Sequence, residues 1–355
     1  SCKQPEVMER VRGKAANGFI CFTQFNEGLE LLARATGNQQ YRDLAQTLEP
    51  LLEPRGDQHT HGYLTTLRGH LMIYETTRDA KLLEAVERRY QDMVDSGSIL
   101  INGGLLEYFK PGYDRDEGCS EADFLRLLLQ LWRLTGKEMY LEQAERCLHN
   151  VFYANQYETG DFGHHGYDSR GYIPLAGAGR AWWCCTMHGM RAFRDVLDAV
   201  VTVAADKDGQ PAAVQVNLWE EGLYGNKANA IRIKCLGMPE GTTQLQYAIS
   251  IEDAADQGVV LTLRKPGWAA SLQTARIVEK KREVIAVQET ANNVTLPALK
   301  PGETVEVLLD CVLSLIRRNG QHITLDALNT DKAEEYALFF GPWLMGVDSY
   351  WNPMF

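Results

Sequence analysis

The chain of 355 residues is long enough for two domains, and its 45% hydrophobic and 23% charged residues are typical of a water-soluble globular protein. Its formal net charge of -11 argues against a nucleic-acid-binding surface and suits a neutral or cationic ligand. No apolar run reaches the roughly 18 to 20 residues that span a bilayer, so we expect no membrane partner. The compartment stays open: we expect a soluble protein from the cytoplasm or periplasm of a bacterium.

Apolar residues recur every three or four positions from residue 7 to about residue 200, which predicts amphipathic helices. Such stripes cover residues 18–37, 41–53, 63–79, 80–97, 121–136 and 138–156. The segments LARATGNQQYRDLAQTL and LWRLTGKEMYLEQAERCL share one helix-turn-helix pattern, and YETTRDAKLLEAVERRY repeats it loosely. Repeated hairpins of this kind predict a helical solenoid or its closed relative, the (α/α) toroid.

The period of the apolar residues changes to two after about residue 205. Short alternating segments such as AIRIKCLG, TTQLQYAISI and TVEVLLD are separated by Gly, Pro, Asn and Asp, which predicts strands joined by turns. The fold class is therefore mainly α with a β domain. We predict a helical domain over residues 1–206 and an antiparallel β-sandwich over residues 207–355.

The adjacent cysteines Cys184 and Cys185 cannot easily form a disulfide with each other, because disulfide geometry disfavours consecutive residues. Together with Glu117 and Cys119 they offer three thiols and one carboxylate, which is a ligand set that Zn²⁺ accepts. The spacing matches no common zinc-finger pattern. Two buried thiols and one reactive thiol are therefore the alternative interpretation.

Acid and base candidates lie in the loops of the helical half. Glu107 follows two glycines and has Leu106, Tyr108 and Phe109 around it, and apolar surroundings would raise the pKa of its carboxyl, as a general acid requires. Asp123, at the start of the next predicted helix, is expected to act as an N-terminal charge partner, as is Glu121.

Several histidines are further candidates. His188 is four residues beyond Cys184, so one helical turn would bring the two side chains together. His59 and His61 alternate in DQHTHGY, and two histidines alone are weak evidence for a ligand site. His164 and His165 lie in a glycine-rich loop, where they either line a polar site or face solvent.

An ordered set of motifs runs through the chain from about residue 18 to about residue 348. The set comprises INGG followed by Glu107, Glu117-Gly118-Cys119, the helix EADFLRL, the pair Cys184-Cys185, LRKPGWA and FFGPWLMG. In this order the motifs resemble the β-L-arabinofuranosidase family, glycoside hydrolase family 127 and its relatives. Each fragment alone is weak evidence, whereas the ordered set is fairly specific.

The resemblance implies an (α/α)6 toroid followed by a β-sandwich. It also implies a retaining exo-glycosidase that releases an arabinofuranose-like sugar from a glycoside or oligosaccharide. The implied Zn²⁺ ligands are Glu117, Cys119, Cys184 and Cys185, with Cys184 also the nucleophile and Glu107 the acid/base. The residues expected to contact the substrate are His59, His61, Tyr167 and His188.

The chain departs from the family pattern in several places. The segment between Glu107 and Glu117 is shorter, Thr186-Met187-His188 replaces a turn that contains proline, and the loop around Tyr167 differs. About four helical hairpins are readable instead of six, so we expect the N-terminal part of the toroid to be missing or divergent. These departures leave the identity of the sugar open.

Two other functions stay open. A toroid-fold glycosidase or polysaccharide lyase would act through Glu107, Asp123, Tyr167 or a histidine, with the cysteines structural. A carbohydrate-binding or scaffold protein would use zinc only to hold the two cysteine-bearing loops together, because four protein ligands usually mark a structural zinc site.

Overall fold

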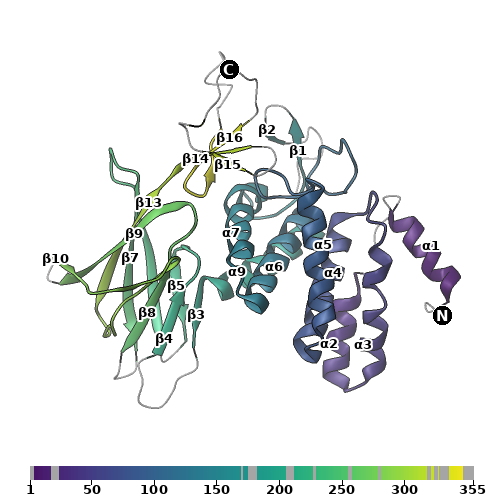
Figure 1. The fold of residues 1–355 in the computed structure, drawn as a ribbon, viewed down its shortest axis with the longest axis horizontal. Helices are drawn as coiled ribbons and strands as arrows, with labels where there is room; N and C mark the ends of the chain where they lie inside the picture. Colours follow the sequence, from purple (N-terminus) through teal and green to yellow (C-terminus); the bar gives the residue numbers. More distant parts are fainter. Residues whose placement is uncertain are drawn as a thin grey trace. The chain divides into compact units, whose positions relative to one another are not determined.

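The computed structural model describes residues 4–16, 24–168, 171–174, 182–204, 212–226, 229–254, 258–278, 281–317, 321–323, 327 and 336–346. The chain divides into two compact units, one of residues 1–193 with 347–355 and the other of residues 194–346. The first unit is helical and the second is rich in strands (Figure 1). Among the described residues, no helix is long and apolar enough to cross a membrane.

The helical unit is a series of helical hairpins. Its long helices are α1 (Pro5–Ala16), α2 (Asn26–Thr36), α3 (Gln39–Gln46), α4 (Thr60–Thr77), α5 (Ala80–Asp95), α6 (Gly118–Thr135), α7 (Glu138–Cys147) and α9 (Trp183–Val200). Shorter elements are the 3-10 turn η1 (Glu49–Leu52), the π-helical turn η2 (Leu148–Phe152), α8 (Tyr153–Asn155) and the hairpin of β1 (His165–Asp168) with β2 (Gly171–Pro174). Helix α9 runs from the helical unit into the strand-rich unit.

The predicted repeat has a clear basis in the hairpin turns. Helices α2 and α6 end at Gly37 and Gly136, whose φ angles of 71° and 68° are left-handed and favour glycine. The looser copy has Arg78 at this position, also left-handed with φ 59°. Asn38 and Asp79 cap the helices that follow, because each side chain accepts the backbone N–H two residues further on.

The segment 41–53, predicted as one helix, is not continuous. Helix α3 ends at Gln46, and a separate 3-10 turn holds residues 49–52 with Pro50 in its first turn. Proline has no N–H to donate and favours a helix start, so Pro50 fits a new turn better than the interior of a long helix.

The core of the helical unit forms where α2, α4 and α6 pack side by side, each followed by the second helix of its hairpin (Figure 1). The fully buried side chains of α4 and α6 include Leu64, Leu67, Leu71, Phe124, Leu125 and Leu128. Burial of each such side chain stabilises the unit by about 1.5 to 3 kcal/mol. The first turns of α4 and α6 are thereby held next to each other.

The described strands of the strand-rich unit form three sheets. A six-stranded sheet has the order β10 (Lys281–Val284), β9 (Ala269–Val278), β13 (Thr304–Cys311), β7 (Gln244–Asp253), β6 (Ala230–Gly237), β5 (Gly222–Gly225). A five-stranded sheet has the order β11 (Gln288–Glu289), β12 (Asn293–Thr295), β8 (Val259–Arg264), β4 (Ala212–Val216), β3 (Val201–Val203). A four-stranded sheet has the order β15 (His322–Ile323), β14 (Leu313–Arg317), β16 (Tyr336–Phe340), β17 (Trp343–Leu344).

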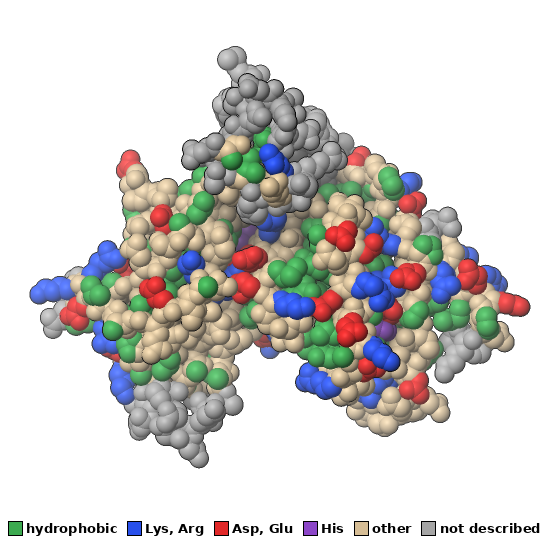
Figure 2. Space-filling model, viewed as in Figure 1, with side chains coloured by type: hydrophobic (Ala, Val, Ile, Leu, Met, Phe, Trp, Pro, Cys, Tyr) green, Lys and Arg blue, Asp and Glu red, His purple; other side chains and the backbone are tan. Residues whose placement is uncertain are grey.

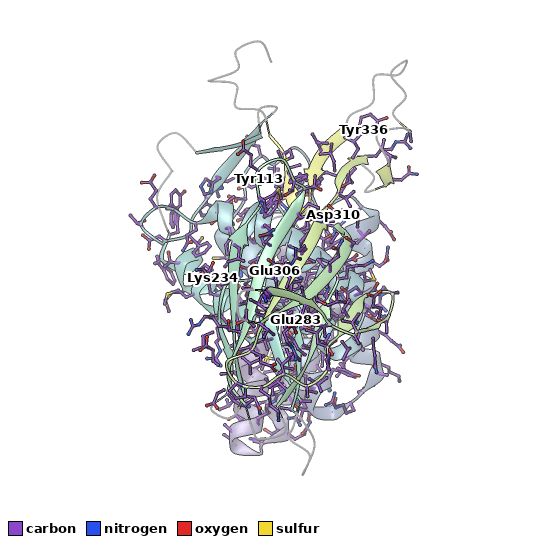
Figure 3. The ribbon with its side chains drawn as sticks, turned by 90° about the vertical axis from the view of Figure 1, so that its left-hand side faces the viewer. Tyr113, Lys234, Glu283, Glu306, Asp310 and Tyr336 are labelled. Atoms are coloured by element: carbon purple, nitrogen blue, oxygen red, sulfur yellow. The ribbon has the colours of Figure 1, made fainter. Side chains whose placement is uncertain are left out.

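The predicted alternation of buried and exposed residues is present along the long strands. In β7 every second residue from Leu245 to Ile251 is buried. On β13 the side chains of Glu306 and Asp310 lie between buried neighbours and remain accessible, and on β6 Lys234 is exposed next to the buried Ile233 (Figure 3). One face of the six-stranded sheet is therefore apolar and the other polar, as expected for a sheet that covers a core.

Strand pairing is antiparallel with one exception among the described strands. Strands β4 and β8 run parallel, with Ala212 beside Val259 and Val216 beside Leu263. The chain between them forms β5, β6 and β7 of another sheet, and this long connection allows β8 to return in the direction of β4. Between the two large sheets, the indole of Trp219 donates to the carbonyl of Arg264 at 3.1 Å, and its ring lies 5.0 Å from that of Tyr247.

Candidate active site

The loop between α5 and α6 is fixed against the start of α4. The backbone N–H of Thr60 donates to the carbonyl of Glu107 at 2.9 Å, and that of Phe109 donates to Gln58 at 3.0 Å. The backbone N–H of Glu107 donates in turn to the carbonyl of Arg115 at 3.0 Å. These backbone bonds bring the carboxyl of Glu107 close to His59, the residue that precedes α4.

The first turns of α6 and α9 meet on a third segment, residues 162–163. The N–H of Gly118, the first residue of α6, donates to the carbonyl of Gly163 at 2.8 Å, and the N–H of Trp182 donates to that of Phe162 at 3.0 Å. A Cβ on Gly118 would lie 3.0 Å from the Cβ of Cys185. Glycine at this position thus allows α6 to approach α9 closely.

This approach brings the four predicted metal ligands together. Glu117 precedes α6, Cys119 lies in its first turn, and Cys184 and Cys185 lie in the first turn of α9, not in a loop as the sequence suggested. Their four ligand atoms all lie within 4.8 Å of one another, and the Sγ atoms of Cys119 and Cys185 are 3.6 Å apart. We call these four residues the cysteine quartet.

The donor set and spacing of the cysteine quartet fit a tetrahedral zinc ion. Zinc lies about 2.3 Å from a thiolate and about 2.0 to 2.2 Å from a carboxylate oxygen, which places neighbouring sulfurs about 3.8 Å apart in a tetrahedron. The observed 3.6 Å between Cys119 and Cys185 is close to that separation. Cys119 and Cys185 are buried, whereas Cys184 is partly exposed.

Hydrogen bonds within the cysteine quartet distinguish its thiols. A hydrogen bond from Cys119 lowers the pKa of Cys184 to about 6, although burial and the negative charge of Glu117 act in the opposite direction. The same contact raises the pKa of Cys119, which is the donor. Of Cys119 and Cys184, Cys184 thus loses its proton more readily. The thiolate is the nucleophilic form of cysteine.

Glu117 is held as a carboxylate. Burial raises the pKa of its carboxyl, but the contact with His59, with further contributions from His61 and Ser120, outweighs burial and lowers it to about 2. The Nε2 of His59 lies 3.2 Å from Oε2 of Glu117, and the hydroxyl of Ser120 donates to the same oxygen at 2.9 Å. Glu117 is therefore charged at neutral pH and available as a metal ligand.

The surroundings of Glu107 are more polar than the sequence suggested. The hydroxyl of Tyr113 donates to Oε2 of Glu107 at 2.7 Å, and the guanidinium of Arg115 binds the same oxygen through Nε at 2.5 Å and through Nη2. The expected apolar surroundings are thus wrong, because the loop folds back and brings Tyr113 and Arg115 to the carboxylate of Glu107. The other oxygen, Oε1, lies 3.9 Å from Nε2 of His164.

Glu107 and the cysteine quartet are neighbours. Ligand atoms of His59, Glu107 and Glu117 lie within 4.8 Å of one another, so Glu117 belongs both to the quartet and to this second group. The candidate acid/base and the candidate nucleophile therefore both lie close to the carboxylate of Glu117, within a single site.

Asp123 and Glu121 do not serve as exposed charge partners of a helix end. Both are fully buried, and burial raises the pKa of Glu121 well above its usual value, so this side chain is neutral and accepts the N–H of Leu105 at 3.1 Å. Burial also raises the pKa of Asp123, but its contacts with His188 and His61 and the nearby charge of Arg68 outweigh burial and hold the pKa well below its usual value. The first turns of α6 point into the core, so their carboxylates need partners there.

The other predicted histidines lie in or beside the site. His59, His164 and His165 are buried, and the rings of His61 and His188 are 4.4 Å apart. Burial lowers the pKa of His164 and lowers that of His165 to about 4, so both are neutral at pH 7. Tyr167 belongs to strand β1, but its side chain lies outside the described part of the chain.

The contacts of Tyr113 and Arg115 with Glu107 were not predicted from the sequence. The available signal was the pair of residues six and eight positions after a candidate catalytic carboxylate, in a loop rich in turn residues.

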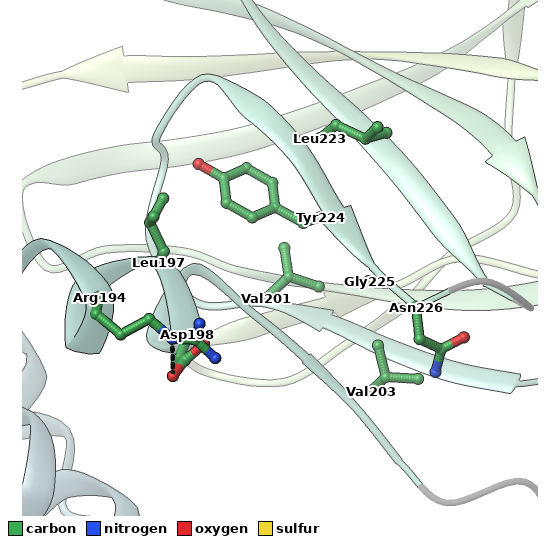
Figure 4. A pocket seen from close by; sticks show the side chains of 9 residues that line it. All are labelled: Arg194, Leu197, Asp198, Val201, Val203, Leu223, Tyr224, Gly225 and Asn226. Atoms are coloured by element: carbon green, nitrogen blue, oxygen red, sulfur yellow. Dashed lines mark hydrogen bonds and ion pairs between the residues drawn. The ribbon is translucent and has the colours of Figure 1, made fainter.

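Elsewhere, the strand-rich unit contains a hollow of about 400 Å³ lined by Val201, Leu223 and Tyr224 and by the ion pair of Arg194 with Asp198, at 2.8 Å (Figure 4). No predicted site residue lines this hollow.

Comparison with known proteins places this geometry in a family. Three solved structures share the fold: a GH127 β-L-arabinofuranosidase from Geobacillus stearothermophilus T6 (TM-score 0.59, 15% identity), a GH127 β-arabinofuranosidase (0.63, 18%) and a glycoside hydrolase (0.61, 13%). The matches cover 96%, 96% and 97% of this chain and 62%, 59% and 61% of those proteins, respectively. The chain thus spans about three fifths of their length.

No protein of curated function matches the sequence. The catalytic-domain family of GH127 β-L-arabinofuranosidases matches residues 7–198, more than half of the chain, and this range includes Glu107 and the whole cysteine quartet. The chain belongs to the GH127 β-L-arabinofuranosidase catalytic-domain family.

Proposed function

We propose that this protein is a retaining exo-glycoside hydrolase that releases an arabinofuranose-like sugar from a glycoside or oligosaccharide. The observation that carries the proposal is the convergence of three thiols and Glu117 beside Glu107, within the residues that match the family. Acidic and basic side chains are interspersed on the molecular face in Figure 2, which suits an uncharged sugar better than a polyanion.

The proposal includes the architecture. We infer that the helical hairpins are part of an (α/α)6 toroid and that the two large sheets form a β-sandwich. The repeated hairpin turns and the side-by-side packing of α2, α4 and α6 support the toroid. The contacts of Trp219 with both large sheets support the sandwich.

Zn²⁺ is the proposed cofactor, held by Glu117, Cys119, Cys184 and Cys185. When bound, zinc would keep the three thiols deprotonated and so supply a thiolate at neutral pH. Glu117 is already charged, and His59 and Ser120 orient its Oε2. Such outer partners are a common means of positioning metal ligands.

In the first step, the thiolate of Cys184 attacks the anomeric carbon while the bond from that carbon to the leaving oxygen breaks. Glu107 gives its proton to this oxygen, and the sugar becomes bonded to Sγ of Cys184. In the second step, Glu107 takes a proton from water, the water oxygen bonds to the anomeric carbon, and the thiolate leaves. Two inversions give retention of configuration.

The partners of Glu107 indicate which of its oxygens carries the proton. Tyr113 and Arg115 occupy Oε2, whereas Oε1 accepts neither of these bonds and lies 3.9 Å from Nε2 of His164. Oε1 is therefore the proposed proton donor and acceptor. The predicted substrate contacts remain His59, His61, His188 and Tyr167. Of these, His59 already contacts Glu117 through Nε2.

Replacement of single thiols tests the nucleophile. Cys184→Ser, loaded with zinc, should lose at least about 10³-fold in turnover of aryl arabinofuranosides. Cys185→Ser is the matched control, because it removes a neighbouring ligand and leaves the proposed nucleophile. Measurable turnover should remain in Cys185→Ser after zinc loading. Wild-type turnover in zinc-bound Cys184→Ser would refute Cys184 as the nucleophile. Loss of turnover in both zinc-bound variants, with sugar binding intact, would instead favour a structural role for the zinc site.

Leaving-group dependence tests the acid. Glu107→Gln should lose about 10² to 10⁴-fold in turnover of substrates with poor leaving groups, because general acid catalysis is typically worth that much. Nitrophenyl glycosides, whose leaving oxygen needs little protonation, should retain far more of their rate in the first step. An equal loss of the first-step rate with both kinds of substrate would contradict the role of Glu107 as the acid.

A further inference from the structure

A second group of metal-ligand side chains lies in the helical unit and shares no residue with the cysteine quartet. It consists of His61 in the first turn of α4, Asp123 in α6 and His188 in α9. One ligand atom from each lies within 4.8 Å of the other two. We call these three residues the histidine–aspartate group.

Both imidazoles face one oxygen of Asp123. The Nδ1 of His61 lies 2.5 Å from Oδ2 of Asp123, and the Nδ1 of His188 lies 3.4 Å from the same oxygen. The two rings are inclined by 71°. Three helices that are distant in the sequence thus present two nitrogens and one oxygen to a common point.

The carboxylate of Asp123 is fixed by residues that bind its other oxygen. Arg68 and Arg126 donate to Oδ1 at 3.0 and 3.1 Å, and the hydroxyl of Thr65 donates to Oδ2 at 3.1 Å. This arrangement directs Oδ2 towards both histidines. Glu27 pairs with Arg68 at 2.6 Å and so offsets one of the two positive charges.

One atom of the histidine–aspartate group has no satisfactory partner. The Nδ1 of His188 is buried and makes no hydrogen bond, although the carboxylate oxygen lies 3.4 Å away. An unsatisfied buried polar atom destabilises the folded state. Oδ2 already accepts from Thr65 and contacts His61 at 2.5 Å, whereas the 3.4 Å to Nδ1 of His188 is too long for a good hydrogen bond.

A cation between the three atoms would satisfy all of them. Transition-metal ions bind imidazole nitrogen at about 2.0 to 2.1 Å and carboxylate oxygen at about 2.0 to 2.2 Å, which gives a nitrogen-to-oxygen separation of about 3.3 Å in a tetrahedron. The 3.4 Å between His188 and Asp123 already fits. His61, at 2.5 Å, would give up its contact with Oδ2 and move back by a rotation of its ring.

We propose that His61, Asp123 and His188 form a second binding site, for a divalent transition-metal ion of the Zn²⁺ or Co²⁺ kind. Two imidazoles and one carboxylate leave a coordination position open for water or a ligand, unlike the four protein ligands of the cysteine quartet. Binding should be weaker than at the quartet, because Arg68 and Arg126 place positive charge next to Asp123.

Cobalt titration followed by absorption spectroscopy tests the second site without any activity assay. Added to metal-free wild-type protein, the first equivalent of Co²⁺ should give an intense thiolate-to-cobalt band in the near ultraviolet, from the cysteine quartet. A second, weaker equivalent should add only visible d–d absorption. His188→Asn and His61→Asn should each lose the second equivalent and keep the first, which also shows that the variants are folded.

His70→Gln is the matched control, because His70 is buried in the same helix as His61 but belongs to neither group; it should bind two equivalents. One equivalent in the wild type, or two undiminished equivalents in both His188→Asn and His61→Asn, would overturn the second site. Absence of the thiolate band with the weaker equivalent retained would instead refute the cysteine quartet. The two proposals therefore fail separately.

Discussion

The two units of the molecule bury different kinds of side chain. In the helical unit the interior holds many charged and titratable groups, among them Glu30, Glu49, Asp116, Glu117 and Asp123. Among the described residues of the strand-rich unit, the buried polar side chains are Asn217, Asn229 and Arg264. Burial of a charge is unfavourable unless it is paired, so the many buried charges around the candidate site cost the helical unit more stability than Arg264 costs the described part of the strand-rich unit.

Removal of a buried charge from the helical unit should have the largest effect on stability. Asp123→Ala deletes the carboxylate that Arg68, Arg126 and two histidines contact. We expect it to lower the free energy of unfolding of the helical unit by about 3 to 5 kcal/mol, as for other broken buried ion pairs. Urea denaturation followed by circular dichroism measures this, and a loss under about 1 kcal/mol would contradict the role of Asp123 as a buried anchor.

Removal of a buried apolar side chain from the strand-rich unit should have a purely structural effect. Leu261 of β8 is fully buried, and Leu261→Ala should lower the free energy of unfolding by about 2 to 4 kcal/mol through lost burial and a cavity. Below the unfolding transition, zinc stoichiometry should equal that of the wild type. A change in zinc binding in the folded variant would break the separation between the two units.

Acidification should weaken the helical unit through its buried histidines. Burial lowers the pKa of His70 from 6.5 to about 4, so between these values the unfolded chain binds a proton that the folded chain excludes. Stability from this group is complete above about pH 6.5 and falls by up to about 3 kcal/mol as pH decreases to about 4. Unfolding free energies of His70→Gln should fall less steeply over this range than those of the wild type. Parallel curves would contradict the burial argument.

The sequence allowed both kinds of interior to be predicted in outline. The spacing of apolar residues changes from three or four positions to two, and this change predicted the helical and strand-rich parts, because periodicity reports which face of an element is buried. The grouping of the cysteine quartet could also be expected, since its residues lie in two short motifs that carry three thiols and one carboxylate, whereas the position of Cys184 and Cys185 in a helix was not foreseen. The break in the predicted helix at Pro50 was missed. The parallel pairing of β4 with β8 was also missed, because strand direction depends on connections that periodicity does not record.

The polar interior of the helical unit was the least predictable part. Asp123 has the position of an ordinary charge at a helix start, and only the packing of α6 against α4 and α9 reveals its buried partners. Glu107 has apolar neighbours in the sequence, but the fold of the loop brings Arg115 and Tyr113 to its carboxylate. Contacts of this kind join side chains from different elements and leave no periodic trace.

Direct detection of the sugar on Cys184 tests the central claim best. Zinc-loaded Glu107→Gln should react with an activated aryl arabinofuranoside but should lack the base for the second step, so the covalent intermediate should accumulate. Mass spectrometry of the intact protein and of its peptides should then find one sugar residue on the peptide with Cys184. No adduct during turnover, or an adduct on a residue other than Cys184, would contradict the account.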